Sequence, residues 1–142
     1  MTISQALKEK NKKISTLQKL WDRLLRYNVV VEGETRPYST TNTWNDIVTL
    51  TGEIAKLKTD IHRASEPVRL HIFMMSELKN KAIRLRGLNT SNGVQHDRYS
   101  NTTTVQVADL DVLWKDMTLD LIERQIEDTQ ELLDKFNHTT HI

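Results

Sequence analysis

The final third of the sequence decides the fold: QHDRYSNTTTVQV at residues 95–107, followed by ADLDVLWKDMTLDLIERQIEDTQELLDKFN at residues 108–137. The second stretch carries large apolar residues at steps of three and four, which is the spacing of one buried face of an α-helix. No glycine or proline interrupts it. A helix from Val107 to about Asn137 would be roughly 45 Å long at about 1.5 Å per residue. Its partners are therefore expected to be long helices or other subunits.

The segment before this helix predicts a β-hairpin over about residues 95–107. Its Tyr, Thr and Val residues favour strands, and Ser100 begins a polar turn between the two halves. Alternation along the second strand places Val105 and Val107 on one face. Because an isolated hairpin is only marginally stable in water, we expect it to pack on the helices, on the Val29–Val31 segment or on a neighbouring subunit.

Length and composition limit the rest of the architecture. Residues 1–142 are long enough for one domain, and we predict a single helical domain. Hydrophobic residues make up 37% of the chain and charged residues 27%, which suits amphipathic helices with one buried face each. The four glycines and two prolines leave few turns. The expected fold is mainly α: an elongated bundle of about four long helices, with a short β-hairpin before the last one.

The first predicted helix runs from Ile3 to about Tyr27. Thr2 and Gln5 are placed to form a capping box at its start, in which the two side chains bond to each other's backbone N–H. The β-branched run Val29–Val31 then interrupts the helical pattern. A connection containing a short extended piece is expected there, and that piece is a candidate to pair with the later hairpin.

Two more helices are predicted between this connection and the hairpin. One begins near Asn42 or Thr43, either of which can act as an N-cap, and ends before Pro67, because the residue before a proline is pushed out of the α region. The next covers about residues 71–88. Residues 68–72 between them are compatible with either a brief strand or a helix.

Charge is distributed unevenly along the chain, although the net charge is only +1. Residues 1–26 carry a net +5, residues 27–66 a net −2, residues 67–98 a net +4 and residues 99–142 a net −6. The basic first and third helices are expected to complement the acidic last helix, within one subunit or between subunits. The alternative is that the basic helices bind nucleic acid or an anionic membrane, but the acidic helix would cancel most of their field.

Several catalytic classes lack their residues in this sequence. There is no cysteine, no glycine-rich phosphate loop and no nucleophile elbow, so no catalytic, cofactor-binding or metal-binding residue is predicted and an enzyme is the less favoured class. His138 and His141 are interpreted as parts of a solvated tail. No stretch has the apolar length of a membrane span or of a secretory signal, and a cytoplasmic location is expected.

The hairpin supplies the residues singled out as interface or ligand contacts: His96, Arg98, Tyr99, Val105 and Val107. If the segment is a strand throughout, His96 and Arg98 share one side and Tyr99 lies on the other. An Arg and a Tyr that brace the hairpin against a helix or a neighbouring subunit are favoured over a catalytic set. A small-ligand or enzymatic site at a subunit junction is the alternative.

Five motifs follow one another along nearly the whole chain: VVVEGET at 29–35, IHRAS at 61–65, DRYS at 97–100, TVQVADL at 104–110 and NHTTHI at 137–142. Together they resemble a family of small, mostly helical bacterial proteins of unknown function, typified by a corynebacterial member and sometimes labelled septicolysin. The resemblance implies a helical architecture with a hairpin before the last helix and assembly into a symmetric homo-oligomer, with a hexamer as one candidate. It brings no established activity. The sequence thus predicts a non-enzymatic, self-assembling helical protein with a structural or interaction role.

Overall fold

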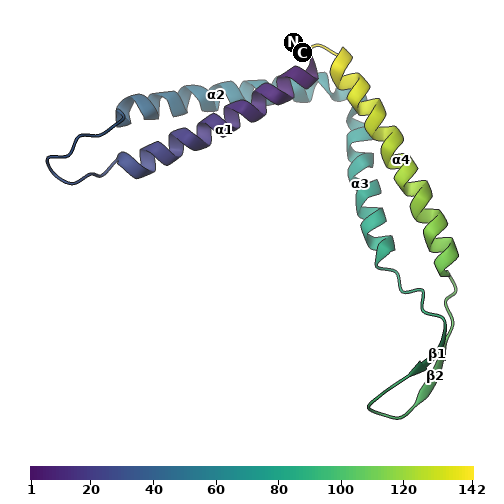
Figure 1. The fold of residues 1–142 in the computed structure, drawn as a ribbon. Helices are drawn as coiled ribbons and strands as arrows, with labels where there is room; N and C mark the ends of the chain where they lie inside the picture. The colour runs from purple at the N-terminus through teal and green to yellow at the C-terminus, as the bar shows by residue number, and fades with distance from the viewer. The chain divides into compact units, whose positions relative to one another are not determined.

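In the computed structural model of the protein, residues 1–142 are all described, and most of them are helical (Figure 1). The elements in chain order are α1 (Ile3–Tyr27), α2 (Thr40–Ala64), the short 3-10 helix η1 (Glu66–Val68), α3 (Arg69–Arg86), β1 (Gly93–His96), β2 (Thr103–Gln106) and α4 (Val112–Thr139). The two strands form one antiparallel sheet. The prediction of a mainly α fold with a hairpin before the last helix is confirmed.

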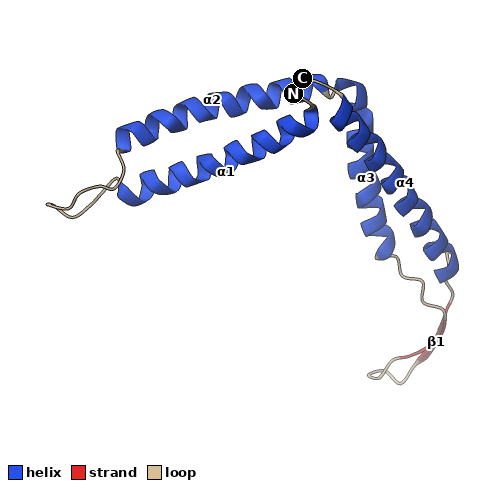
Figure 2. Cartoon of the chain, turned by 45° about the horizontal axis from the view of Figure 1, so that its top comes forward, coloured by secondary structure: helices blue, strands red, loops and turns tan.

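The chain divides into two compact units. Unit 1 consists of Met1–Val68 with Asp134–Ile142, and unit 2 of Arg69–Leu133. Each unit is built on two helices that lie side by side (Figures 1 and 2): α1 and α2 in unit 1, α3 and most of α4 in unit 2. The single domain expected from the length stays a prediction.

The two ends of the chain meet in unit 1. The predicted capping box is present at the start of α1: the Thr2 hydroxyl accepts a hydrogen bond from the Gln5 N–H at 3.2 Å, and Gln5 Oε1 accepts one from the Thr2 N–H at 2.9 Å. Thr2 also forms an antiparallel β-bridge with His141, and the Ile142 N–H donates to the Met1 carbonyl at 3.1 Å. His138 and His141, which we expected in a solvated tail, are both exposed, but the residues at 141 and 142 are also paired with the N-terminus.

The second helix begins earlier than the sequence predicted. α2 starts at Thr40 rather than at Asn42 or Thr43, because Ser39 acts as the N-cap and its hydroxyl accepts a hydrogen bond from the Asn42 N–H at 3.2 Å. Thr43 lies inside the helix, where it is buried and its hydroxyl donates to the Ser39 carbonyl at 2.8 Å. The first of several possible caps is the one that is used.

A narrow apolar seam holds unit 1 together. Its buried residues are Ile3, Ala6 and Leu20 of α1 and Thr43, Ile47 and Ile54 of α2. The ammonium group of Lys13 lies 2.8 Å from the Glu53 carboxylate, and the rings of Trp21 and Trp44 meet edge to face at 6.0 Å. Residues late in α1 thus face residues early in α2, so the two helices are antiparallel.

The α1–α2 connection forms no strand. The Val29–Val31 segment does not pair with the hairpin, and the sheet contains β1 and β2 alone, so the expected pairing is wrong. Instead, the guanidinium group of Arg36 donates hydrogen bonds to the carbonyls of Tyr27 at 3.0 Å and Asn28 at 2.9 Å. These bonds satisfy carbonyls that the end of α1 leaves free. The loop is therefore folded back onto its own helix.

The start of α3 settles the ambiguity of residues 68–72. The 3-10 turn Glu66–Val68 leads directly into α3 at Arg69, so this segment is helical and α3 begins before the predicted His71. Pro67 lies in that turn, at a position where the missing N–H removes no α-helical hydrogen bond. The proline therefore marks a change of helix rather than a strand.

The core of unit 2 is a small apolar cluster between α3 and α4. Its buried members are Leu78, Ala82 and Ile122, and the partly buried Leu85, Leu119 and Ile126 pack against them. At one end of the pair, Lys115 Nζ donates to the carbonyls of Arg86 at 2.8 Å and Leu88 at 3.0 Å. The Arg86 guanidinium lies 3.2 Å from the Glu123 carboxylate, so a basic residue of α3 does pair with an acidic residue of α4 within one chain.

The last helix begins five residues later than predicted, at Val112 rather than Val107. Asp111 Oδ1 accepts a hydrogen bond from the Trp114 N–H at 2.8 Å, which is the interaction of an N-cap. The apolar spacing that suggested an earlier start continues through Leu110, but Leu110 lies outside the helix. A capping carboxylate, not the apolar pattern, sets the boundary.

Replacement of this cap should weaken α4. We expect Asp111→Ala to lower the free energy of unfolding by about 0.5–2 kcal/mol, since the Trp114 N–H loses its acceptor. Chemical denaturation followed by far-UV circular dichroism measures the change. Asp109→Ala, two residues earlier and outside the helix, is the matched control with an expected change within about 0.5 kcal/mol. Equal losses in the two variants would contradict the assignment of the cap.

Truncation of a side chain in the core of unit 2 should lower the free energy of unfolding more than loss of the Asp111 cap does. Ile122 is 2% exposed and Ile83 is 64% exposed, so the same Ile→Ala change has different consequences at the two positions. We expect Ile122→Ala to lower the free energy of unfolding by about 2–5 kcal/mol because it leaves a cavity, and Ile83→Ala by less than about 1 kcal/mol. Urea titration of both variants tests the difference. A smaller loss for Ile122→Ala than for Ile83→Ala would mean that the cluster is not the core of this unit.

Candidate functional site

The hairpin presents an apolar pair of residues to solvent. In the strand register Val94 faces Val105 and His96 faces Thr103, so all four side chains share one side of the sheet. His96 Nδ1 lies 3.3 Å from Thr103 Oγ1. Val105 is 70% exposed, and every residue of both strands is exposed. Val94 is a member of this face that the sequence prediction missed, because β1 begins at Gly93 rather than at residue 95.

The turn of the hairpin is longer than the sequence suggested. Arg98 and Tyr99 lie in this turn and not on a strand, so the predicted sharing of one strand face by His96 and Arg98 is wrong. The cause is Asp97: Oδ1 accepts a hydrogen bond from the Tyr99 N–H at 2.9 Å and Oδ2 accepts one from the Ser100 hydroxyl at 2.7 Å. These bonds stabilise a turn at the point where strand alternation would otherwise continue.

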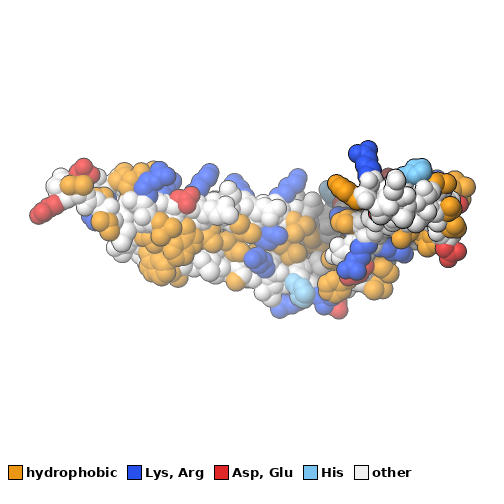
Figure 3. All heavy atoms as spheres, turned by 90° about the horizontal axis from the view of Figure 1, so that it is seen from below, with side chains coloured by type: hydrophobic (Ala, Val, Ile, Leu, Met, Phe, Trp, Pro, Cys, Tyr) orange, Lys and Arg blue, Asp and Glu red, His pale blue; other side chains and the backbone are white.

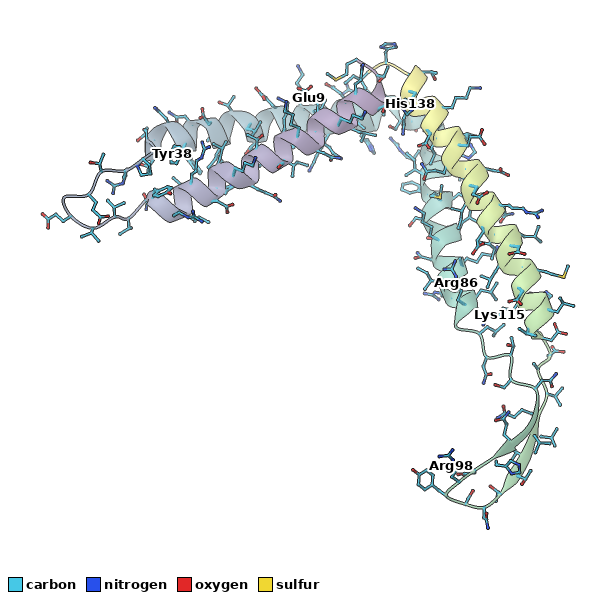
Figure 4. The ribbon with its side chains drawn as sticks, viewed as in Figure 1. Glu9, Tyr38, Arg86, Arg98, Lys115 and His138 are labelled. Atoms are coloured by element: carbon cyan, nitrogen blue, oxygen red, sulfur yellow. The ribbon has the colours of Figure 1, made fainter.

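A shallow hollow of about 510 Å³ lies at the turn end of this hairpin. Its lining residues are Gln95, His96, Asp97, Arg98, Tyr99, Thr102, Thr104 and Gln106. All of them are exposed, and Figure 4 shows Arg98 at the turn, away from the labelled Arg86 and Lys115 of the helical part of unit 2. The structure thus brings His96, Arg98 and Tyr99 into one hollow, but without the burial that positions a catalytic group.

The lowered pKa of Asp97 in this hollow has a local explanation. The hydrogen bond from the Ser100 hydroxyl, followed by that from the Tyr99 N–H, holds the pKa of the Asp97 carboxyl below its ordinary value of 3.8. Both donors favour the charged carboxylate. The shift therefore reports the turn, and no ligand is needed to account for it.

The structure exposes a second apolar face on α4. Leu119, Ile122 and Ile126 belong to the cluster with α3, whereas Leu113, Met117 and Leu121 are 64%, 60% and 60% exposed. Met117 and Ile122 are five residues apart, which places them about 140° apart around the helix. We call Leu113, Met117 and Leu121 the outer stripe of α4. One seam with α3 cannot cover both faces.

Exposed apolar side chains also occur on the other helices. On α3 the most exposed are Leu70, Phe73 and Ile83. In Figure 3 the apolar side chains form broad patches between the charged ones on the visible face of the molecule. Patches of this kind mark interaction surfaces more often than isolated apolar residues do.

Unit 1 has an aromatic and basic cluster at its loop end. The Arg23 guanidinium lies 4.4 Å from the centre of the Tyr38 ring, and the Tyr27 and Tyr38 rings are 5.7 Å apart. With Lys19, Asp22 and Arg26 these residues line a hollow of about 270 Å³. Figure 4 shows Tyr38 where the loop joins the helix pair. The stacking of Arg23 on Tyr38 holds the loop against α1.

The structure contains neither a cluster of metal-binding side chains nor a helix that could span a membrane. No group of three or more His, Asp or Glu side chains is close enough to hold a metal ion. The ring of His138 donates from Nδ1 to the Asp134 carbonyl at 2.6 Å within α4, and His141 belongs to the bridge with Thr2. None of the helices combines the length and the apolarity needed to cross a bilayer.

Comparisons of the chain with protein-family models, with curated proteins and with solved structures found no match. The resemblance to the family labelled septicolysin therefore stays a prediction from sequence motifs. The function must be argued from the surfaces of the chain itself, of which the outer stripe of α4 and the apolar side of the hairpin are the most conspicuous.

The hairpin turn should depend on pH through Asp97. Its folded-state pKa is lowered, so its stabilising effect is present above the unfolded value of about 3.8 and is lost as the pH falls through the lower folded value. We expect the nuclear Overhauser contacts between Val94 and Val105 to weaken as the pH falls below about 4. Asp97→Asn keeps an acceptor for the Tyr99 N–H but has no charge to titrate. The same pH profile in this variant would assign the effect to another group.

Proposed function

We propose that this chain is a non-enzymatic structural protein that assembles with copies of itself, and that the outer stripe of α4 lies in the contact. The observation that carries the proposal is the pair of opposed apolar faces on α4, of which only the one containing Ile122 is covered. A soluble helix normally needs a single apolar stripe. A second stripe on the same helix is typical of one that packs on two partners.

The exposed area supports a partner of substantial size. The accessible surface of the chain is 10974 Å². A standard interface buries about 800 Å² on each partner. The surface is therefore ample for one or more contacts with other copies.

The hairpin extends the same argument along unit 2. The exposed Val105 and Val107 precede Leu110, which in turn precedes the outer stripe. Two strands with a bare apolar side are marginal by themselves. A partner that covers the hairpin and the outer stripe together would stabilise both, which agrees with the interface role predicted for Val105 and Val107.

A second copy is the partner that the charges favour. The same chain carries a block of +5 in residues 1–26 and a block of −6 in residues 99–142, so two copies can present opposite charge to each other. Binding of nucleic acid or an anionic membrane has less support, because Arg86 of basic α3 is already paired with Glu123. A ligand site at the hairpin has less support because its hollow is fully exposed. A cytoplasmic location belongs to the same proposal.

Sedimentation equilibrium at micromolar concentration tests the proposal. We expect a stable oligomer, with a hexamer as the size that the resemblance implies. Met117→Glu should raise the dissociation constant by about 100-fold or more, since it places an unpaired carboxylate in an apolar contact. Leu25→Glu, at a position that is 75% exposed on α1, is the matched control and should have a much smaller effect. A folded wild-type monomer would overturn the proposal.

A further inference from the structure

Four basic side chains form a row on α1. They are Lys8, Lys12, Lys19 and Arg23, separated by four, seven and four residues, and all of them are exposed. These steps are close to whole turns of a helix, so the four residues lie within about 60° of one another around α1. Figure 3 shows Lys and Arg side chains spaced along the α1–α2 part of the molecule. We call these four residues the basic row.

Four acidic side chains on α4 repeat the same spacing. Asp116, Asp120, Glu127 and Glu131 are also separated by four, seven and four residues, and they too are exposed. They lie within about 60° of one another, next to the outer stripe of α4. We call them the acidic row. Each row spans about 22 Å at about 1.5 Å per residue.

The match between the rows extends over their whole length. When α1 and α4 lie parallel, each member of the basic row can lie opposite the acidic residue whose number is higher by 108, so that Lys8 meets Asp116 and Arg23 meets Glu131. The order four, seven, four is unchanged on reversal, so an antiparallel arrangement aligns the rows equally well. Complementary charge along two surfaces of this length fixes both partner and register.

No member of either row forms an ion pair inside the chain, although Asp22 lies beside Lys19 and Arg23, and Arg124 lies on the acidic side of α4 between Asp120 and Glu127. The ion pairs within the helix pairs join Lys13 to Glu9 and Glu53, and Arg86 to Glu123, and none of these residues belongs to a row. Like charges four residues apart on a helix repel each other, and each row contains two such pairs. An opposite row placed against it would replace this repulsion with attraction.

We infer that the basic row of α1 in one copy lies along the acidic row of α4 in a second copy, an inference that rests on the proposed self-assembly. The two surfaces differ, so the contact can be made reciprocally in a two-fold pair or head to tail along a series of copies. In the head-to-tail case the first copy keeps a free acidic row and the second a free basic row, and further copies add until the assembly closes into a ring or continues as a filament. The outer stripe, which lies beside the acidic row, adds apolar area to the same contact.

Charge exchange tests this contact. Lys12→Glu with Lys19→Glu reverses half of the basic row, and Asp120→Lys with Glu127→Lys reverses the matching half of the acidic row. Arg23 is left unchanged because it also holds Tyr38. We expect each double variant to be folded by circular dichroism and to dissociate at least about tenfold more readily than the wild type at about 0.1 M salt. Lys56→Glu with Lys58→Glu on α2 makes the same change in net charge as the α1 variant and serves as its control.

Mixing the two double variants is a stricter test of the contact. An equimolar mixture of the two double variants should recover the wild-type mass, because each reversed row meets a complementary one on the other variant. The chain with all four substitutions should recover it alone.

Four other outcomes would overturn the inference, and they separate it from the proposed function. Double variants that keep the wild-type mass would place the contact elsewhere and leave self-assembly intact. A monomeric wild type would contradict both the inferred contact and the proposed self-assembly. A changed sedimentation coefficient at unchanged monomer mass would mean that the rows meet within one chain. Binding of a single-stranded oligonucleotide that is lost with Lys12→Glu and Lys19→Glu, without a change in mass, would assign the basic row to nucleic acid.

Discussion

Two antiparallel helices bury only the seam between them, and this limit governs the rest of the structure. Eleven buried hydrophobic residues serve both units, so neither has the layered core that a third or fourth packed helix would give. Buried apolar surface stabilises a fold by roughly 25 cal/mol per Å². With so few buried side chains, this stabilisation exceeds the conformational entropy cost of ordering long helices by only a small margin. Each seam, such as the Leu78, Ala82 and Ile122 cluster, therefore needs additional stabilising interactions.

Some of these additional interactions are hydrogen bonds at the ends of the helices. Arg36 bonds to the last carbonyls of α1, Lys115 bonds to those of α3, and Thr2 and Asp111 cap the starts of α1 and α4. Such bonds keep helix ends from fraying but bury no apolar surface. The remaining apolar faces, above all the outer stripe of α4, stay exposed. In this protein the thin core and the exposed apolar faces have the same cause, because no third helix covers those residues in either unit.

The helices could be predicted because their pattern is set by the seams. Residues such as Ile47 and Ile54 recur at the helical period only because one side of each helix is buried, so α1 to α4 could be recognised before the structure was known. The capping box of Thr2 was equally accessible, since both of its members lie within one turn. The helix starts were less accessible. Several residues near Ser39 and Asp111 can act as caps, and the choice among them depends on the path of the preceding loop.

The candidate site was predicted in composition but not in geometry. The five residues singled out do belong to the hairpin, but the side chain of Asp97 bonds to the residues after it and takes Arg98 and Tyr99 off the strand. The exposed state of Val105 could not be read from alternation, which gives the face of a residue and not whether that face is covered. The charge blocks were visible in the sequence, whereas the two matched rows require helix boundaries.

The bridge between Thr2 and His141 has a consequence for the order of folding. α1 and α2 are neighbours in the chain and can close on each other while the rest is still being synthesised, since local contacts form early. The strand-like pairing at the start of α1, however, joins residues far apart in the sequence and must wait until the segment around His141 has been synthesised. The helix pair of unit 1 can thus begin to fold before unit 2 has been made, whereas the pairing that completes unit 1 forms only after it.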